Sequence, residues 1–154
     1  MRELVQDAAA ATSQLFADKG IACETQLPER VPLVVADRDR LQQVLLNLLS
    51  NAVKFSPSRD GLVRVALTLE PERVRVDVTD NGAGVDPRDH DSIFEKFRQV
   101  GDTLTDKPRG TGLGLPISRQ IVRQFGGELR VESVPGHGAT FSFTLPLTSA
   151  AGGQ

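Results

Sequence analysis

The sequence predicts an α/β fold, a two-layer sandwich in which helices cover one face of a mixed, mostly antiparallel sheet. Residues 62–69 and 73–80 are the clearest strands, because they form a hairpin pattern around a Glu-Pro-Glu turn. Residues 38–54 repeat apolar side chains at helical spacing after a candidate N-cap at Asp37. A further helix and strand pair are predicted at 113–125, 128–134 and 139–147. Strand pairs interleaved with amphipathic helices indicate a single sheet with helices packed on it.

The rest of the chain adds shorter elements to this pattern. They are a helix, two short strands and a short helical segment, predicted at 3–18, 21–27, 33–36 and 86–97. Residues 98–112 are polar, basic and contain glycine without any periodicity, so we expect a mobile loop. We assign residues 1–147 to one domain and expect residues 148–154 to be a disordered tail.

Composition excludes several classes of protein. The chain has 154 residues and a net charge of −2, which does not favour binding to nucleic acid. Its single cysteine, Cys23, excludes an internal disulfide and fits a reducing cytosol. No apolar run approaches the ~20 residues of a membrane-spanning helix. We therefore expect a cytoplasmic domain, with any membrane anchor outside this chain.

A polar strip lies on the helix predicted over 38–54. Asn47, Asn51 and Lys54 share one side of that helix, and the two asparagines are neighbours at i and i+4. Their carbonyl oxygens are suitable ligands for Mg²⁺, and the lysine suits a phosphate. The same strip is also consistent with the solvated face of an ordinary amphipathic helix.

Asp80 has the wrong parity for a surface residue. In the strand 73–80 it falls on the same side as the three valines, so it should point toward the core. A buried carboxylate needs donors, and the exocyclic amine of adenine is one. The alternative is that the strand has already ended and that Asp80 belongs to an Asp-Asn-Gly turn.

Two later segments are rich in glycine. Residues 110–115 open the helix predicted over 113–125, where free backbone amides favour polyphosphate. They match neither the Walker pattern nor the dinucleotide fingerprint, and a flexible linker is the alternative. Residues 135–141 join the last two strands, where a hairpin turn is the simpler interpretation.

Five motifs in this order resemble the catalytic and ATP-binding domain of bacterial sensor histidine kinases. That family shares a superfamily, and a Bergerat-type fold, with gyrase, the large heat-shock chaperone and the mismatch-repair ATPase. The matching motifs are the N box, first glycine box, F box, second glycine box and third glycine box, at 47–55, 80–84, 93–97, 110–115 and 136–141. The similarity covers about residues 3–147, and five weak motifs in one order are together specific.

The resemblance implies ATP and Mg²⁺ as cofactors and assigns a role to each motif residue. Asn51 ligates Mg²⁺, while Asn47 and Lys54 act catalytically beside the metal and phosphates. The nucleotide contacts are Asp80, Gly82, Gly84, Gly110, Thr111, Gly112, Leu113, Gly114 and Thr140. Among these, Asp80 binds the adenine amine, Thr140 lies near the adenine, and residues 98–112 form an ATP lid.

Other motif positions allow more than one interpretation. Phe94 and Phe97 anchor the base of the lid, or meet a partner domain, or simply pack in the core. Many relatives carry an arginine where this chain has Gln99, so the resemblance does not carry a γ-phosphate contact over to Arg98, the residue before it. Lys107 and Arg109 either make that contact instead or are solvated charges of the lid.

Position 47 separates a kinase from a hydrolase. Hydrolytic members of the superfamily carry a glutamate where Asn47 stands, and an amide cannot serve as a general base. His90 and His137 fall outside any long helix, so the phosphoacceptor histidine must lie on another domain. The resemblance implies phosphoryl transfer to that domain in two-component signalling, with a downstream response regulator. It also implies a monomeric fragment of a homodimeric parent. A non-catalytic nucleotide sensor and a superfamily ATPase are the alternatives.

Overall fold

The sheet has the mixed topology that the sequence predicts. The computed structural model describes residues 1–32, 34–57, 59–90, 92–94, 114–133 and 135–147. Within these ranges the sheet has five strands in the order β1-β2-β3-β5-β4. The strands are β1 Ala22–Gln26, β2 Leu62–Leu69, β3 Arg73–Asp80, β4 Glu128–Ser133 and β5 Ala139–Pro146. Only the pairing of β1 with β2 is parallel, and the other three pairings described are antiparallel.

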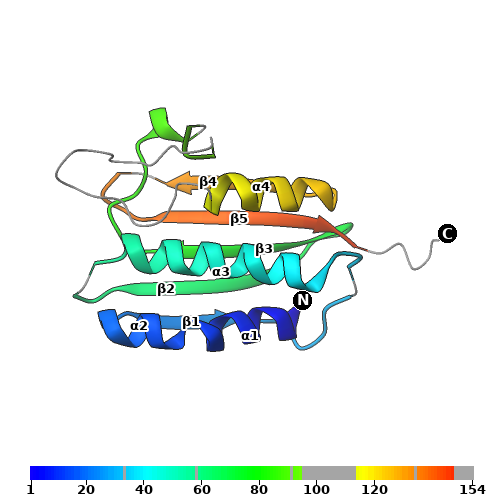
Figure 1. Ribbon diagram of the computed structural model, residues 1–154, viewed down its shortest axis with the longest axis horizontal. Helices are drawn as coiled ribbons and strands as arrows, with labels where there is room; N and C mark the ends of the chain where they lie inside the picture. The colour runs from blue at the N-terminus through cyan, green and yellow to red at the C-terminus, as the bar shows by residue number, and fades with distance from the viewer. Residues whose placement is uncertain (33, 58, 91, 95–113, 134, 148–154) are drawn as a thin grey trace.

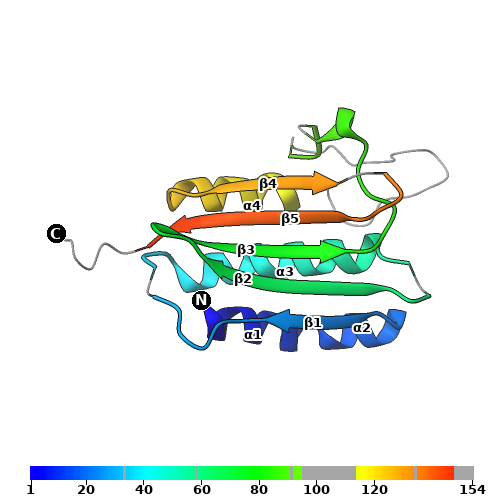
Figure 2. The ribbon, with the colours of Figure 1, turned by 180° about the vertical axis from the view of Figure 1, so that it is seen from behind.

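Four helices form the second layer. They are α1 Arg2–Ala11, α2 Ser13–Lys19, α3 Arg38–Phe55 and α4 Gly114–Gln124. All four lie on one face of the sheet (Figure 1), and the opposite face carries no helix in the part of the chain described (Figure 2). This arrangement confirms the predicted two-layer α/β sandwich.

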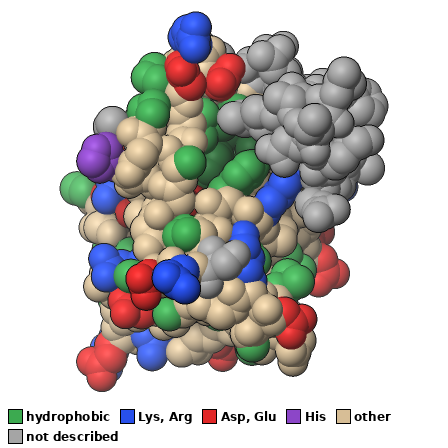
Figure 3. Space-filling model, turned by 90° about the vertical axis from the view of Figure 1, so that its left-hand side faces the viewer, with side chains coloured by type: hydrophobic (Ala, Val, Ile, Leu, Met, Phe, Trp, Pro, Cys, Tyr) green, Lys and Arg blue, Asp and Glu red, His purple; other side chains and the backbone are tan. Residues whose placement is uncertain are grey.

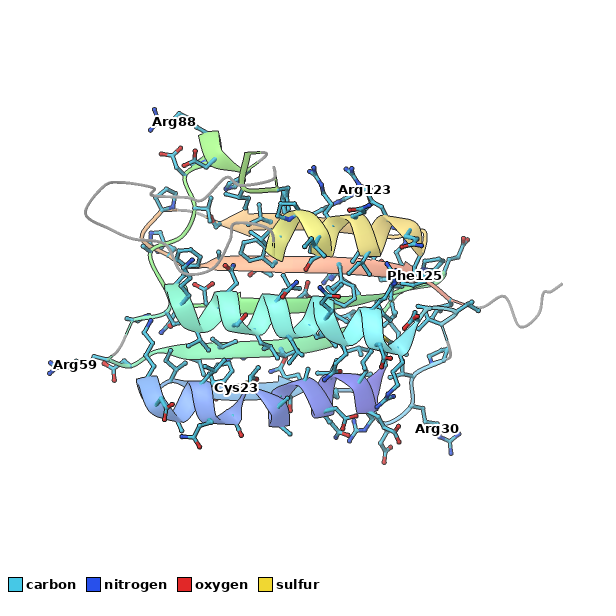
Figure 4. The ribbon with its side chains drawn as sticks, viewed as in Figure 1. Cys23, Arg30, Arg59, Arg88, Arg123 and Phe125 are labelled. Atoms are coloured by element: carbon cyan, nitrogen blue, oxygen red, sulfur yellow. The ribbon has the colours of Figure 1, made fainter. Side chains whose placement is uncertain are left out.

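The core lies between the sheet and α3. Alternate residues of β2, β3 and β5 point toward the helices because successive side chains of a strand face opposite ways. From these strands the core receives Val63, Val65, Leu67, Val74, Val76, Val78, Phe141, Phe143 and Leu145. The helix α3 buries its apolar stripe against them, with Leu41, Val44, Leu45, Leu48 and Leu49. Arg123 of α4 points away from α3 (Figure 4), so α4 also turns its polar side outward.

Two predicted elements are wrong in detail. The helix predicted over 3–18 is two helices that meet at Thr12, whose backbone has φ −102° and ψ 3° and whose hydroxyl bonds back to the carbonyls of Ala8 and Ala9. The strand predicted at 33–36 does not form over residues 34–36, and Val35 is 76% exposed. β1 is an edge strand of the sheet described, and residues 34–36 do not pair with it, which a sequence pattern alone cannot reveal.

The predicted helical segment 86–97 is also different. Its described residues form two short 3₁₀ turns, η1 Pro87–Asp89 and η2 Ser92–Phe94. The predicted lid at 98–112 and the predicted tail at 148–154 lie outside the described residues. Among the helices that are described, none is both long and apolar enough to cross a membrane.

Candidate nucleotide-binding site

The helix α3 carries the predicted polar strip. Asp37 begins the helix as predicted, since its Oδ1 accepts from the backbone N–H of Asp39 at 2.9 Å and of Arg40 at 3.2 Å. Asn47, Asn51 and Lys54 are all partly buried, unlike the exposed Ser50 on the same helix. The strip is therefore only partly exposed to solvent.

Asn47 connects α3 to α4. Its Nδ2 donates to Ser118 Oγ at 3.1 Å and to the carbonyl of Gly114 at 3.3 Å. At the other end of the same helix pair, Arg40 Nη1 donates to Gln124 Oε1 at 3.3 Å. These contacts make the two helices antiparallel, so α4 begins beside Asn47. The positive end of the α4 dipole is thereby close to the polar strip, as a phosphate site requires.

Asn51 and Lys54 extend the strip toward the end of α3. No described residue makes a hydrogen bond to the side-chain amide of Asn51, so its Oδ1 is available for a ligand. Lys54 Nζ lies 5.3 Å from the centre of the Phe55 ring, a cation–π distance. The described residues hold no cluster of three His, Cys, Asp or Glu side chains. A Mg²⁺ ion at this strip would therefore depend on amide, phosphate and water oxygens, which this hard cation accepts.

Lys19 supports the end of α3 from a distant part of the sequence. Its Nζ donates to the carbonyl of Val53 at 2.8 Å and to that of Lys54 at 3.1 Å. These carbonyls belong to the last turn of the helix and have no partner within it. A cation at this position both satisfies them and interacts favourably with the negative end of the helix dipole.

Asp80 is a buried acid at the end of β3. The strand continues through Asp80, and the residue is only 5% exposed, which confirms the inward orientation predicted from parity. Its Oδ1 accepts from the N–H of Gly82 at 2.8 Å, so it also forms the turn that the alternative interpretation proposed. Burial raises the pKa of the Asp80 carboxyl above its ordinary value, and backbone hydrogen bonds from Gly82 and Ala139 oppose this rise.

Two glycines let the backbone approach Asp80 closely. A Cβ at Gly82 would come within 2.0 Å of the Phe55 carbonyl oxygen, where α3 ends. A Cβ at Gly138 would come within 2.1 Å of the Asp80 carbonyl oxygen, and Gly138 has a φ of +85°. Both positions therefore require glycine. The first and third glycine boxes thus meet at Asp80, where Gly136 N–H also bonds the carbonyl of Ala83 at 2.5 Å.

Thr140 does not face Asp80. In the β3–β5 pairing, Ala139 lies opposite Asp80 and Thr140 lies opposite Thr79. The hydroxyls of Thr79 and Thr140 are 2.9 Å apart, on the sheet face without helices. The side chain of Thr140 therefore points away from Asp80, so the two predicted nucleotide contacts lie on opposite faces of the sheet, because a shift of one residue along a strand reverses the side-chain direction.

The remaining predicted residues divide between the core, the surface and the undescribed segment. Gly84 has a positive φ of 84° in the loop that follows β3. Phe94 is buried and makes an edge-to-face contact with Phe141, with the ring centres 6.4 Å apart, which favours its core-packing interpretation. His137 is exposed, whereas His90 is partly buried with Nε2 3.1 Å from the Val85 carbonyl oxygen. The predicted contacts at Gly110, Thr111, Gly112 and Leu113, together with Phe97, lie outside the described residues.

The site residues follow a spatial order along α3. Gly82 and Asp80 adjoin Phe55 at the end of the helix, Asn51 lies one turn earlier, and Asn47 lies beside the start of α4. From Asn47 to Phe55 the helix advances by about 12 Å. One end therefore offers a buried acid and the other offers amides and a helix N-terminus. Figure 3 looks onto the end of the molecule where α3 and β3 end.

Comparison with known families agrees with this arrangement. A family model described as "Histidine kinase-, DNA gyrase B-, and HSP90-like ATPase" matches residues 36–149. The chain belongs to this family. Its matched region includes α3, β2 to β5 and α4, and therefore every described residue of the site except Lys19.

The proteins similar to this chain in sequence include sensor kinases. The chain is 36% identical to the sensor protein GacS of Pseudomonas syringae pv. syringae over 97% of its own length and 17% of the relative. It is 38% identical to the adaptive-response sensory kinase SasA of Synechocystis sp., over 86% of this chain and 34% of the relative. The chain thus spans between about a sixth and a third of these two proteins.

Solved structures give the same family. The catalytic domain of histidine kinase ThkA, in a nucleotide-free form, matches with a TM-score of 0.83 and 28% identity over 96% of this chain and 92% of that chain. Full-length ShkA in complex with AMPPNP matches with a TM-score of 0.82 and 36% identity, over 94% of this chain and 29% of that chain. The fold and the family are therefore those of histidine kinase catalytic domains.

Sequence reasoning missed two residues that organise the site. Ser118 is 0% exposed on the apolar face of α4, beside Ile121 and Val122 in helical spacing. A polar residue in such a stripe is a signal that could have been noticed. Lys19 carried no signal, because its partners are 34 and 35 residues away in sequence.

Proposed function

We propose that this domain binds Mg²⁺-ATP and transfers the γ-phosphoryl group to a histidine on a separate phosphoacceptor domain. The observation that carries the proposal is the chemical identity of residue 47 and its hydrogen bonds. Asn47 is an amide, and its Nδ2 is engaged by Ser118 and Gly114, so it cannot take a proton from water. A site of this family that holds ATP without activating water favours transfer to another acceptor over hydrolysis.

Each described site residue has a distinct part in this proposal. Asp80 accepts a hydrogen bond from the exocyclic amine of adenine at a buried position that excludes water. Asn51 supplies an amide oxygen to Mg²⁺, and Lys54 neutralises phosphate charge. Mg²⁺, when bound, neutralises charge on the phosphate oxygens. The first turn of α4 then orients the phosphates through its backbone amides, so catalysis is mainly positioning and charge neutralisation.

The partners follow from the same proposal. A similar solved structure is that of histidine kinase ThkA in complex with the response regulator protein TrrA, at 25% identity and a TM-score of 0.79 over 99% of this chain and 42% of that chain. By analogy, we expect a response regulator to receive the phosphoryl group from the acceptor histidine. We further expect the parent protein to be a homodimer in which this domain is a monomeric unit.

The test is a transfer assay with a separately purified acceptor-helix domain from a sensor kinase. With ATP labelled at the γ-phosphate and Mg²⁺, we expect label on the acceptor histidine and little free phosphate. Nucleotide binding without label on any acceptor domain would instead support the nucleotide sensor. Rapid phosphate release by the isolated domain would support the ATPase.

A matched pair of variants on β3 controls the assay. Asp80→Asn should lose transfer, whereas Asp77→Asn makes the same chemical change on the opposite face of the strand. Asp77 Oδ2 lies 3.2 Å from Arg75 Nε, and the Asp77 side chain points away from the face that carries Asp80. Equal loss in both variants would show that the effect comes from damage to the sheet and not from the site.

A further inference from the structure

The amide orientation of Asn47 is determined by its neighbours on α4. The Gly114 carbonyl oxygen can only accept a hydrogen bond, so the atom of Asn47 that faces it must be the nitrogen. The reverse orientation would place two acceptor oxygens against each other. The second Nδ2 hydrogen then points to Ser118 Oγ at 3.1 Å. Both donors of the Asn47 amide are therefore used within the protein.

The consequence is that Asn47 offers a ligand only an oxygen. No donor among the described residues bonds to its Oδ1, which leaves this atom available. A carbonyl oxygen is attractive to a cation, or to water bound to a cation, but it repels a phosphate oxygen. With Asn51 one turn away on the same strip, two amide oxygens can then face one metal-binding region.

Ser118 is built into the fold as the second of these partners. Its side chain is fully buried, whereas the Gly114 end of α4 is exposed. A buried hydroxyl needs a polar partner, and Asn47 Nδ2 is the one described for it. The serine therefore holds the amide of α3 against α4 at the point where the second glycine box ends.

We infer that Ser118 is a positioning residue for the nucleotide site, which fixes the Asn47 amide so that its Oδ1 faces Mg²⁺ or the water around it. The inference rests on the proposed function for its effect on Mg²⁺-ATP, but the orientation of Asn47 exists without nucleotide. Ser118 itself touches neither the metal nor the nucleotide. Its influence passes through one hydrogen bond between two helices.

The first test uses the protein without nucleotide. In a ¹⁵N NMR spectrum, Ser118→Ala should shift the side-chain amide signals of Asn47, which Asn47→Ala identifies by their loss. Thr12→Val is the matched control, because it removes a buried hydroxyl that bonds within α1 and leaves α4 untouched. Asn47 signals that stay in place in Ser118→Ala would overturn the inference, whatever the function of the domain.

The second test measures how much Mg²⁺ tightens ATP binding, by calorimetry with Mg²⁺ and with EDTA. Ser118→Ala should reduce the tightening by about fivefold, the value of one net hydrogen bond. It should have no further effect in the Asn47→Ala background, because the two residues act as a unit. Additive losses would overturn the inference. If Ser118→Ala does not fold, Ser118→Cys fills the hydroxyl position with a larger atom that is a weaker acceptor, and it should give the same pattern.

These outcomes separate the two ideas. Wild-type protein that binds no nucleotide would overturn the proposed function, and the NMR result would still decide the orientation of Asn47. Wild-type protein with Mg²⁺-dependent binding and an unchanged Ser118→Ala variant would overturn only the positioning role.

Discussion

Replacing Asp80 by asparagine should separate nucleotide binding from stability. The Gly82 N–H donates to Oδ1, so an asparagine keeps its oxygen there and places its NH₂ group where the other carboxylate oxygen lies. That group would face the adenine amine, donor against donor. Losing a charged acceptor and leaving a buried donor unsatisfied costs about 2–3 kcal/mol, or roughly 30- to 150-fold in ATP affinity.

Asp80→Asn should lower ATP affinity but gain stability relative to wild type as the pH rises. Burial raises the pKa of Asp80 in the folded protein. Between the ordinary aspartate pKa and this raised pKa, the folded state therefore holds a proton that the unfolded chain has lost. The wild-type free energy of unfolding therefore falls as the pH rises from the ordinary aspartate pKa to the raised one, and Asp80 contributes no further change above it. Asp80→Asn lacks this fall, so its stability relative to wild type should increase across the same range.

The assay combines calorimetry for ATP affinity with urea unfolding at several pH values. Asp77→Asn serves as the control, since Asp77 lies on the other face of β3 and accepts from Ser142 Oγ. An unchanged ATP affinity in Asp80→Asn would refute the assignment of the base site. A stability difference from wild type that does not vary with pH would refute the raised pKa.

Three further variants test other parts of the site. Asn51→Ala should leave the fold intact and remove most of the Mg²⁺-dependent tightening of ATP binding. The control Gln43→Ala, an exposed change on the same helix, should retain that tightening. Equal Mg²⁺ dependence in both variants would exclude the metal role of Asn51. Gly138→Ala should lower the free energy of unfolding by more than the roughly 1–3 kcal/mol of a strained φ. Gly136→Ala has a similar φ of 86° but open space for a Cβ, so equal losses by urea unfolding would exclude the close approach to Asp80. Lys19→Met should cost about 1 kcal/mol by urea unfolding through the last turn of α3, and an unchanged midpoint would show that the cap is not stabilising.

Local patterns predicted much of the fold because they reflect local physics. The period of 2 in β3 correctly placed Asp80 inside, and the period of 3.6 in α3 correctly placed its leucines against the sheet. The same reasoning was wrong at residues 34–36, because a local pattern does not show whether a segment pairs with a strand of the sheet. It was also wrong at Thr12, where a side-chain hydrogen bond competes with the helix.

Thr140 illustrates the limit of reasoning from motifs. The third glycine box was recognised, but the residue within it that faces the site depends on the register of β5 against β3. In that register Ala139 lies on the same face of the sheet as Asp80, and Thr140 lies on the face without helices. A register error of one residue is invisible in a motif and reverses every side chain.

By itself, the sequence determined the family, the layer pattern, the inward turn of Asp80 and the polar strip of α3. These properties depend on the order of motifs and on periodicities that each element carries within itself. Only the tertiary structure decided that Ser118 holds Asn47, that Lys19 caps α3 and that Gly138 makes room at Asp80. Such contacts join residues far apart in the chain, and their geometry follows from how the helices and strands pack and not from any single segment.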